Sequence, residues 1–242
     1  QKSEGTRYGE FYGYIAEGYF QSEEEIKKSP RQMRELAPGD IKYKDLNDDG
    51  VIDANDQCYL GKSWFPSWSY GMGFNINYHN FDLALFFQGV SDVSIMANGG
   101  SIDTGNGDWG ASGVGIVPFT GMGLNPSNVI TKALDRWTAD NPRADAWYPR
   151  MTANATTNDN NYVNSTHWLK DGSYLRLKQA SLGYTLENKK LMDKGIEYLY
   201  FYLSGQNLLT FSKFKLWDPE LGSNGAKYPL SRMVTLGMRV SF

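Results

Sequence analysis

Cysteine and histidine are scarce in this chain of 242 residues, which holds one cysteine and two histidines. With Cys58 alone, no disulfide can form within the chain, and this by itself decides no cellular compartment. His79 and His167 stand in none of the spacings that bind zinc, and the sequence has neither a phosphate-binding loop nor a serine-hydrolase elbow. We therefore expect a protein that is not an enzyme and that carries no organic cofactor.

Long apolar runs are also missing. No segment approaches the ~20 residues that a membrane-spanning helix needs, which excludes a helical membrane protein. A membrane-spanning β-strand needs only about ten residues of alternating character, so the mean hydropathy of −0.51 does not establish solubility. The net charge of −3, with scattered Lys and Arg, gives no support for a nucleic-acid partner. The first residue is Gln and no signal peptide is visible, which predicts either a removed leader or a piece of a longer chain.

Aromatic residues and glycine are abundant, and apolar residues recur at every second position in several segments. This period is typical of strands with one apolar and one polar face. We expect about six strands, at 7–20, 69–78, 81–89, 175–186, 198–211 and 234–242. The phase of the alternation changes within 175–186, which predicts a bulge or a change of environment there.

Short and long connections alternate along these strands. His79-Asn80 and 187–195 are short, whereas 21–68, 91–172 and 212–230 are long. A soluble sandwich has no reason to place every long loop at one end, but an outer-membrane barrel has short periplasmic turns and long external loops. The sequence therefore predicts an all-β fold, an antiparallel segment of a transmembrane β-barrel whose long loops are extracellular.

Two of the connecting segments have a character of their own. Residues 124–142 are bounded by prolines and predict one short loop helix. Residues 152–166 are polar and low in complexity, which predicts a mobile loop.

The last expected strand ends on a bare aromatic residue. Val234 and every second residue after it are apolar, up to Phe242. In a barrel this strand would run inward and end at the periplasm. We therefore expect Phe242 in the aromatic girdle at that interface.

The segment "DLNDDGVIDAND" (45–56) is the one local motif with metal chemistry in it. Its oxygen-bearing positions follow the spacing of a calcium loop, with Gly50 permitting a sharp turn and Asp56 in place of the usual bidentate Glu. The candidate calcium ligands are Asp45, Asn47, Asp49, Val51 (through its carbonyl), Asp53 and Asp56. The alternative is an acidic turn in which Asp and Asn form Asx-turns without an ion. A structural calcium of modest affinity is therefore the only ion that the sequence predicts.

Several tryptophans fall in the connections. Trp64, Trp68, Trp109 and Trp147 can stack on sugar rings, although interface anchoring and loop packing are commoner uses of such side chains.

An ordered set of motifs along the chain resembles the SusC/RagA family of TonB-dependent outer-membrane transporters of Bacteroidota. The motifs are "GEFYGYIAEGYFQSEEEI" (9–26), "PGDIKYKDLNDDGVIDANDQ" (38–57), "FDLALFFQG" (81–89), "RWTADNP" with "YPR" (136–150), "YLRLKQASLGYTL" (174–186), "YLSGQNLLTF" (202–211) and "YPLSRMVTLGMRVSF" (228–242). They span almost the whole chain, with gaps in the loops.

The resemblance implies a barrel of about 22 strands with an N-terminal plug, of which residues 1–242 would be the C-terminal portion only. Such transporters import glycan or peptide oligomers under a SusD-like lipoprotein lid, and TonB-ExbB-ExbD supplies energy through the plug. The lid would meet the loops 21–68, 91–172 and 212–230. Phe242 would serve as the barrel-assembly signal.

One alternative from a different class stays open at this point. A secreted, calcium-stabilised β-sandwich or carbohydrate-binding module would also explain the acidic loop and the exposed aromatic residues. The two interpretations differ in what the apolar faces touch: hydrocarbon in a barrel, or one another in a sandwich.

Overall fold

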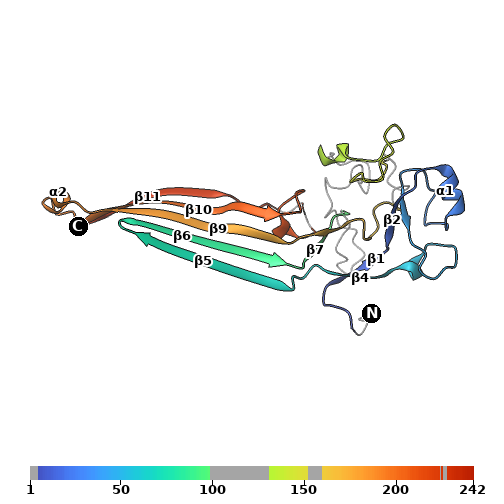
Figure 1. Cartoon of the computed structure of the whole chain (residues 1–242), viewed down its shortest axis with the longest axis horizontal. Helices are drawn as coiled ribbons and strands as arrows, with labels where there is room; N and C mark the ends of the chain where they lie inside the picture. The colour runs from blue at the N-terminus through green and yellow to red at the C-terminus, as the bar shows by residue number, and fades with distance from the viewer. Residues whose placement is uncertain (1–4, 99–130, 152–159, 224, 226–227) are drawn as a thin grey trace. The chain divides into compact units, whose positions relative to one another are not determined.

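A computed structural model describes residues 5–98, 131–151, 160–223, 225 and 228–242 (Figure 1). The chain divides into two compact units. One comprises Pro66–Asp92, Ser173–Lys213 and Pro229–Phe242, and we call it the sheet unit. The other comprises Gln1–Phe65, Val93–Gly172 and Phe214–Tyr228, and we call it the loop unit because it holds most of the long connections. Among the residues that the structure describes, no helix is long and apolar enough to cross a membrane.

The sheet unit is one antiparallel sheet of five long strands (Figure 1). They are β5 (Trp68–Tyr78), β6 (Phe81–Ser91), β9 (Tyr174–Leu186), β10 (Tyr198–Ser212) and β11 (Met233–Ser241). Their order across the sheet is β11-β10-β9-β6-β5, and every neighbouring pair is antiparallel. The period-two alternation thus predicted five of the six expected strands, each within one or two residues of its ends.

Both short connections are tight. Strands β5 and β6 are joined by His79 and Asn80, and His79 has a positive φ of 50°, as a two-residue hairpin turn requires. The connection between β9 and β10 holds a short helix, α2 (Lys189–Met192), whose first turn is capped by the Asn188 side chain.

The predicted irregularity in the middle of 175–186 is a β-bulge. Between β6 and β9, Phe86 pairs with Gln179 and Phe87 with Leu177, so Lys178 is an extra residue on β9. Because the bulge shifts the phase by one residue, Leu177 and the preceding apolar residues lie on the same face as those that follow.

The loop unit contains short strands and helical turns rather than plain loops. β1 (Glu10–Gly13) pairs with β4 (Cys58–Ser63), β2 (Ala16–Tyr19) with β3 (Ile41–Tyr43), and β7 (Ser94–Met96) with β8 (Leu169–Asp171), all antiparallel. The helical elements are α1 (Glu23–Lys28), η1 (Ala54–Asp56), η2 (Thr131–Leu134) and η4 (Pro219–Leu221).

The loop unit has a hydrophobic core of its own. Aromatic side chains dominate it, and Trp168 and Tyr148 are completely buried there, with ring centroids 5.8 Å apart. Every member of this buried apolar cluster belongs to the loop unit, and none belongs to the five-stranded sheet.

Three expectations are corrected by these elements. Residues 7–20 do not add a sixth strand to the sheet, because they form β1 and β2, which pair within the loop unit. Of the expected helix at 124–142, the part from 131 onward forms only a 3₁₀ turn, η2, and 124–130 lie outside the described residues. In the expected mobile loop 152–166, residues 152–159 also lie outside them, but Asn160 and Asn161 are fully buried.

Candidate functional site

The five-stranded sheet has one continuous apolar face. Cross-strand pairing places residues from all five strands in common rows, and one such row is Ile76, Leu83, Leu182, Leu203 and Leu236. The next row towards the short turns is Tyr78, Phe81, Tyr184, Phe201 and Met238. Directly opposite side chains on one face of a sheet are neighbours, so these rows form a single surface.

Many side chains of this apolar face are exposed. Phe74 on β5 is 44% exposed and Leu236 on β11 is 80% exposed. Monomeric soluble proteins rarely leave contiguous apolar areas of this extent uncovered. The face therefore requires a partner that is itself apolar.

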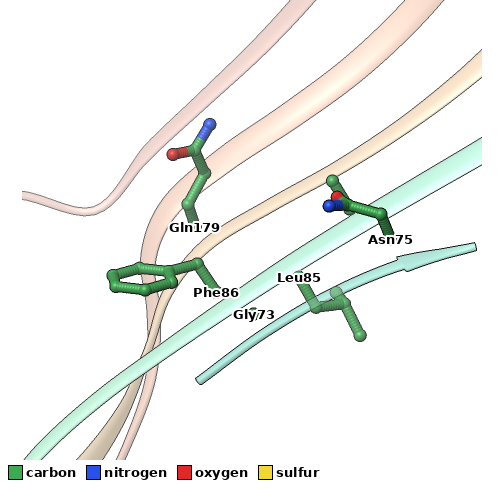
Figure 2. A pocket seen from close by; sticks show the side chains of 6 residues that line it. Gly73, Asn75, Leu85, Phe86 and Gln179 are labelled. Carbon is green, nitrogen blue, oxygen red and sulfur yellow. The ribbon is translucent and has the colours of Figure 1, made fainter. Parts of the chain in front are cut away.

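The opposite face of the sheet is polar and carries a shallow hollow (Figure 2). The hollow is lined by Gly73, Asn75, Ala84, Leu85, Phe86 and Gln179. The Phe86 ring lies beside Gly71, where an added Cβ would approach the ring to 3.3 Å. None of the lining residues is titratable, so the hollow offers amides for hydrogen bonding and one ring for stacking but no catalytic group.

On the polar face, tyrosines of β10 make side-chain contacts near the short turns. The Tyr200 hydroxyl donates a hydrogen bond to Asp82 Oδ2 over 2.9 Å, which links β10 to β6 across β9. Tyr200 and Tyr202 stack with ring centroids 5.9 Å apart. Tyr200 lies against Gly183 on β9, where a side chain would collide with it.

Phe242 follows the end of β11 and its side chain is largely exposed. An exposed terminal aromatic is available to another molecule. Its expected role as an assembly signal stays a prediction.

The acidic loop 45–56 is held by hydrogen bonds within itself. Asp45 Oδ2 accepts from the Gly50 amide at 2.8 Å, and Asp49 Oδ1 accepts from the Val51 amide at 2.9 Å. Asp53 caps η1 by accepting from the Asn55 amide. These contacts fold the segment into a compact turn around Gly50, which has a φ of 81°.

The loop brings some of the predicted ligands together and leaves one oxygen without a partner. Asp56 is fully buried, and its two oxygens accept from the Leu46 and Asp53 amides at 2.8 Å. Burial raises the pKa of Asp56, but hydrogen bonds from the Asp53, Leu46 and Asn47 amides outweigh burial and lower it. Asp45 Oδ1 is buried and has no hydrogen-bond partner. Within the described ranges, no three His, Cys, Asp or Glu side chains converge on a common metal position.

A buried polar network in the loop unit corresponds to no motif in the sequence. Arg150 donates twice to Asp40, with Nε to Oδ1 at 2.8 Å and Nη2 to Oδ2 at 2.9 Å, and Asp40 is only 1% exposed. Asn161 Nδ2 donates to the same carboxylate at 2.7 Å, and Gln32 Nε2 donates to Asn160 Oδ1 at 2.9 Å. These partners are more than 100 residues apart in the chain, so no local motif marks them.

The two histidines lie in different units, His79 in the turn between β5 and β6 and His167 in the loop unit. His167 Nε2 lies 3.2 Å from the Trp147 carbonyl and 3.3 Å from the Tyr19 hydroxyl. Burial, with a smaller contribution from Lys170, lowers the pKa of His167 to about 4, so its imidazole is neutral at pH 7. Trp147 packs against the core of the loop unit, so little of its ring is exposed for stacking on a sugar. Trp109 lies outside the described residues.

Comparison with known proteins adds an independent observation. No family model matches the chain. It is 28% identical over 99% of its length to TonB-dependent receptor P3 of Formosa agariphila, and 30% identical over 96% of its length to TonB-dependent receptor P26 of the same organism. The chain is related to the TonB-dependent receptors. It spans only 22% of the length of each of these two relatives.

Solved structures agree with this chain in fold. The RagAB peptide importer in its open-open state matches with a TM-score of 0.63 and 23% identity, over 96% of the segment and 22% of the importer chain. A second structure, of the RagAB peptide transporter, matches equally well. The resemblance to SusC/RagA-type receptors that the sequence motifs indicated is thereby confirmed.

Proposed function

We propose that this segment is part of an outer-membrane transporter and that its five-stranded sheet is a stretch of the barrel wall. The observation that carries the proposal is the division of the sheet into one exposed apolar face and one polar face. A strand that separates lipid from an aqueous lumen needs this alternation, because its two sides meet different solvents. The relationship to TonB-dependent receptors supports the same conclusion.

The two outer strands of the sheet, β5 and β11, need further strands to pair with. Within the described residues, β5 and β11 each pair on one side only, and an unpaired strand edge is not tolerated in hydrocarbon. The remaining strands, up to about 22, and the plug would then come from chain outside this sequence. The long connections that build the loop unit would face the outside of the cell.

The partners follow from the same proposal. The cargo would be a glycan or peptide oligomer, a SusD-like lipoprotein would cover the loops, and TonB-ExbB-ExbD would act through the plug. The RagAB structures, described as a peptide importer, support a peptide cargo for that protein, and the neutral amides and ring of the hollow suit peptide and oligosaccharide alike. The role is transport rather than catalysis.

Deletion of the natural gene, followed by uptake assays with defined oligosaccharides and peptides, tests the transport function. We expect growth on one class to be lost and to return with the intact gene, and the protein to fractionate with the outer membrane. Unchanged growth on every oligomer tested, or recovery of the protein in a soluble fraction, would contradict the proposal. Deletion of Phe242 alone should reduce the amount that assembles in the membrane, and normal membrane levels would remove its role as the assembly signal.

We also propose that the loop 45–56 binds a structural calcium ion. The unpartnered Asp45 Oδ1 supports this, since a buried carboxylate oxygen without a donor is costly and a cation would satisfy it. The candidate ligands remain Asp45, Asn47, Asp49, Val51, Asp53 and Asp56. A bound ion would stiffen the loop for docking of the lipoprotein, and lid binding that is indifferent to Asp49→Ala and to a chelator would count against this.

The alternative of a calcium-stabilised sandwich or carbohydrate-binding module is less well supported. In a sandwich, Phe74, Leu85, Leu236 and Val240 would meet in a dry interior between two layers. Phe74 and Leu236 are instead open, and the sheet residues contribute nothing to the buried apolar cluster.

A further inference from the structure

The hollow on the polar face of the sheet places an aromatic ring among neutral polar side chains (Figure 2). Phe86 of β6 lies between Gly73 of β5 and Gln179 of β9 in one cross-strand row, and its side chain is 43% exposed. Asn75, two residues beyond Gly73 on β5, adds a second carboxamide to the lining. A phenyl ring gains nothing from contact with water, so its exposure on a polar face points to a contact with another molecule.

Two glycines of β5 keep the Phe86 ring accessible. A Cβ added at Gly71 would lie 3.3 Å from Phe86 Cζ, and one added at Gly73 would lie 3.8 Å from Cδ2. The ring therefore leans over the β5 backbone at two positions that have no side chain. A longer side chain at either position would cover the ring.

Two irregularities of the sheet meet beside this hollow. Gln179, which pairs with Phe86, directly follows the bulge residue Lys178. On the other side of β9, Asn207 and Leu208 of β10 together stand opposite Lys178, and Asn207 has a φ of 53°. Bulges re-aim side chains and are common next to active sites. The sheet thus departs from regular pairing at the point where Gln179 enters the hollow.

The lining of the hollow determines the chemistry of a ligand that would fit it. The carboxamides of Asn75 and Gln179 can each donate and accept hydrogen bonds, and no lining side chain is charged. A charged ligand group would lose water here without gaining a counter-charge. A pyranose unit has the matching surface, because C–H groups form its faces and hydroxyls its rim. One face can stack on the Phe86 ring while the hydroxyls bond to the two amides, and the hollow of about 300 Å³ has room for one such unit.

A peptide matches the hollow less closely than a sugar. Extended peptides bind by pairing their backbone with a free strand edge. The strands β6 and β9 that line the hollow are paired on both sides, so they offer no backbone groups for such pairing. The amides and the ring suit either ligand, but the paired backbone favours the sugar.

We propose that Phe86, Asn75 and Gln179 form a binding subsite for an uncharged pyranose unit of an oligosaccharide. The subsite rests on the proposed function, because it takes the polar face to line the path of the cargo. It narrows that cargo to neutral glycans and assigns three side chains that contact it.

Fluorine NMR of the natural gene product, purified in detergent, tests the subsite. 4-Fluorophenylalanine replaces Phe86 or, as the matched control, Phe87, the next residue of β6, which lies on the apolar face opposite Met72. Each labelled protein is titrated separately with hexamers of glucose, mannose and xylose, with a hexamer of galacturonic acid, and with a neutral, end-capped hexapeptide.

We expect at least one neutral hexasaccharide to shift the resonance at position 86 in a saturable way and to leave the resonance at position 87 in place. No shift at 86 with any neutral sugar overturns the subsite. A shift at 86 that the peptide or the acidic sugar produces as strongly overturns the assigned class of ligand, and equal shifts at 86 and 87 overturn a local contact. Growth of the deletion strain on oligomers is a separate measurement, so a failure of the subsite is distinguishable from a failure of the transport function.

A matched pair of variants tests the hydrogen bonds of the subsite. Asn75 and Asn77 carry the same carboxamide on the same face of β5, but of the two only Asn75 lines the hollow. With the label at 86, Asn75→Leu should weaken binding of the sugar about 2- to 10-fold, as expected for one lost hydrogen bond, and Asn77→Leu should leave it unchanged. Gln179→Leu should weaken binding by a similar factor. Equal effects of the variants at 75 and 77, or unchanged binding in both Asn75→Leu and Gln179→Leu, would overturn the assigned contacts.

Discussion

A charge placed on alternate residues of β11 distinguishes lipid from water as the solvent of the apolar face. Val234 pairs with Gly205 on β10 and lies in the same cross-strand row as Phe74. The apolar face has seven such rows, from the row of Trp68 to the row of Leu186, and the row of Val234 is the fourth. The neighbouring Thr235 points to the polar face. Both side chains are exposed, Val234 by 65%. In water, arginine at either position would change the free energy of unfolding by at most about 0.5 kcal/mol.

A lipid environment makes the two variants unequal. An arginine on the lipid face costs about 2–4 kcal/mol near the bilayer midplane and about 0–1 kcal/mol near its edges. Because row four is central, we expect Val234→Arg to destabilise the protein by about 2–4 kcal/mol. This equals a change of about 30- to 700-fold in the folding equilibrium. Thr235→Arg lies on the polar face and should stay within about 0.5 kcal/mol of the parent.

The assay is a urea titration of the natural gene product folded in lipid vesicles, with both variants measured in the same lipid. Midpoints that separate by the expected free energy, with Val234→Arg the less stable, support the account. Equal midpoints for the two variants would refute the assignment of the faces. A larger loss for Thr235→Arg would reverse it.

Three further predictions concern the loop unit. Arg150→Met leaves the buried Asp40 carboxylate without its cation and should destabilise the unit by about 3–5 kcal/mol, seen as faster amide exchange of its core, whereas Arg150→Lys should lose less. Because folding lowers the pKa of His167 to about 4, the unfolded state binds the extra proton between pH 6.5 and 4. The stabilisation from neutral His167 is therefore full above pH 6.5, and the free energy of unfolding falls by up to about 3 kcal/mol towards pH 4. His167→Gln should abolish this pH dependence, measured by amide exchange. An unchanged pH dependence would contradict its assignment to His167. Calcium at 100 times its dissociation constant should stabilise loop 45–56 by about 2.7 kcal/mol, and Asp45→Asn should weaken this stabilisation. A melting temperature that does not change with calcium would contradict the proposed calcium site.

The strands of the sheet could be predicted because their pattern is local. Alternation over nine or more residues predicts a strand with one apolar and one polar face, whatever lies beyond it. Even the bulge at Lys178 was visible, since the apolar phase reverses there. The order of the strands and the free edges required the structure, because pairing partners leave no mark within a single strand.

The loop unit could not be predicted for the opposite reason. Its core joins Asp40 to Arg150 and Gln32 to Asn160 across more than 100 residues, and its strands are only three to six residues long. Asn160 and Asn161 end a run of Asn and Thr that indicates a loop by composition, yet both are buried by long-range hydrogen bonds. A period-two search also misassigned 7–20, where two short strands follow each other.

The acidic loop shows where sequence and structure inform each other. The spacing identified the oxygen-bearing residues, and the structure shows which of them already have partners. Asp49 and Asp53 accept from nearby amides, as the Asx-turn alternative predicts, while Asp45 Oδ1 has no partner. Only the last observation points beyond a simple acidic turn.

Nitroxide scanning along β11 tests most directly whether the apolar face of the sheet touches hydrocarbon. Spin labels at successive positions from 233 to 241 of the natural gene product, folded in vesicles, report collisions with oxygen, which concentrates in lipid, and with a water-soluble nickel complex. We predict that oxygen collisions peak at the even positions from Val234 to Val240 and that they are low at the odd positions. Even positions shielded from both reagents, or open only to the nickel complex, would contradict the account.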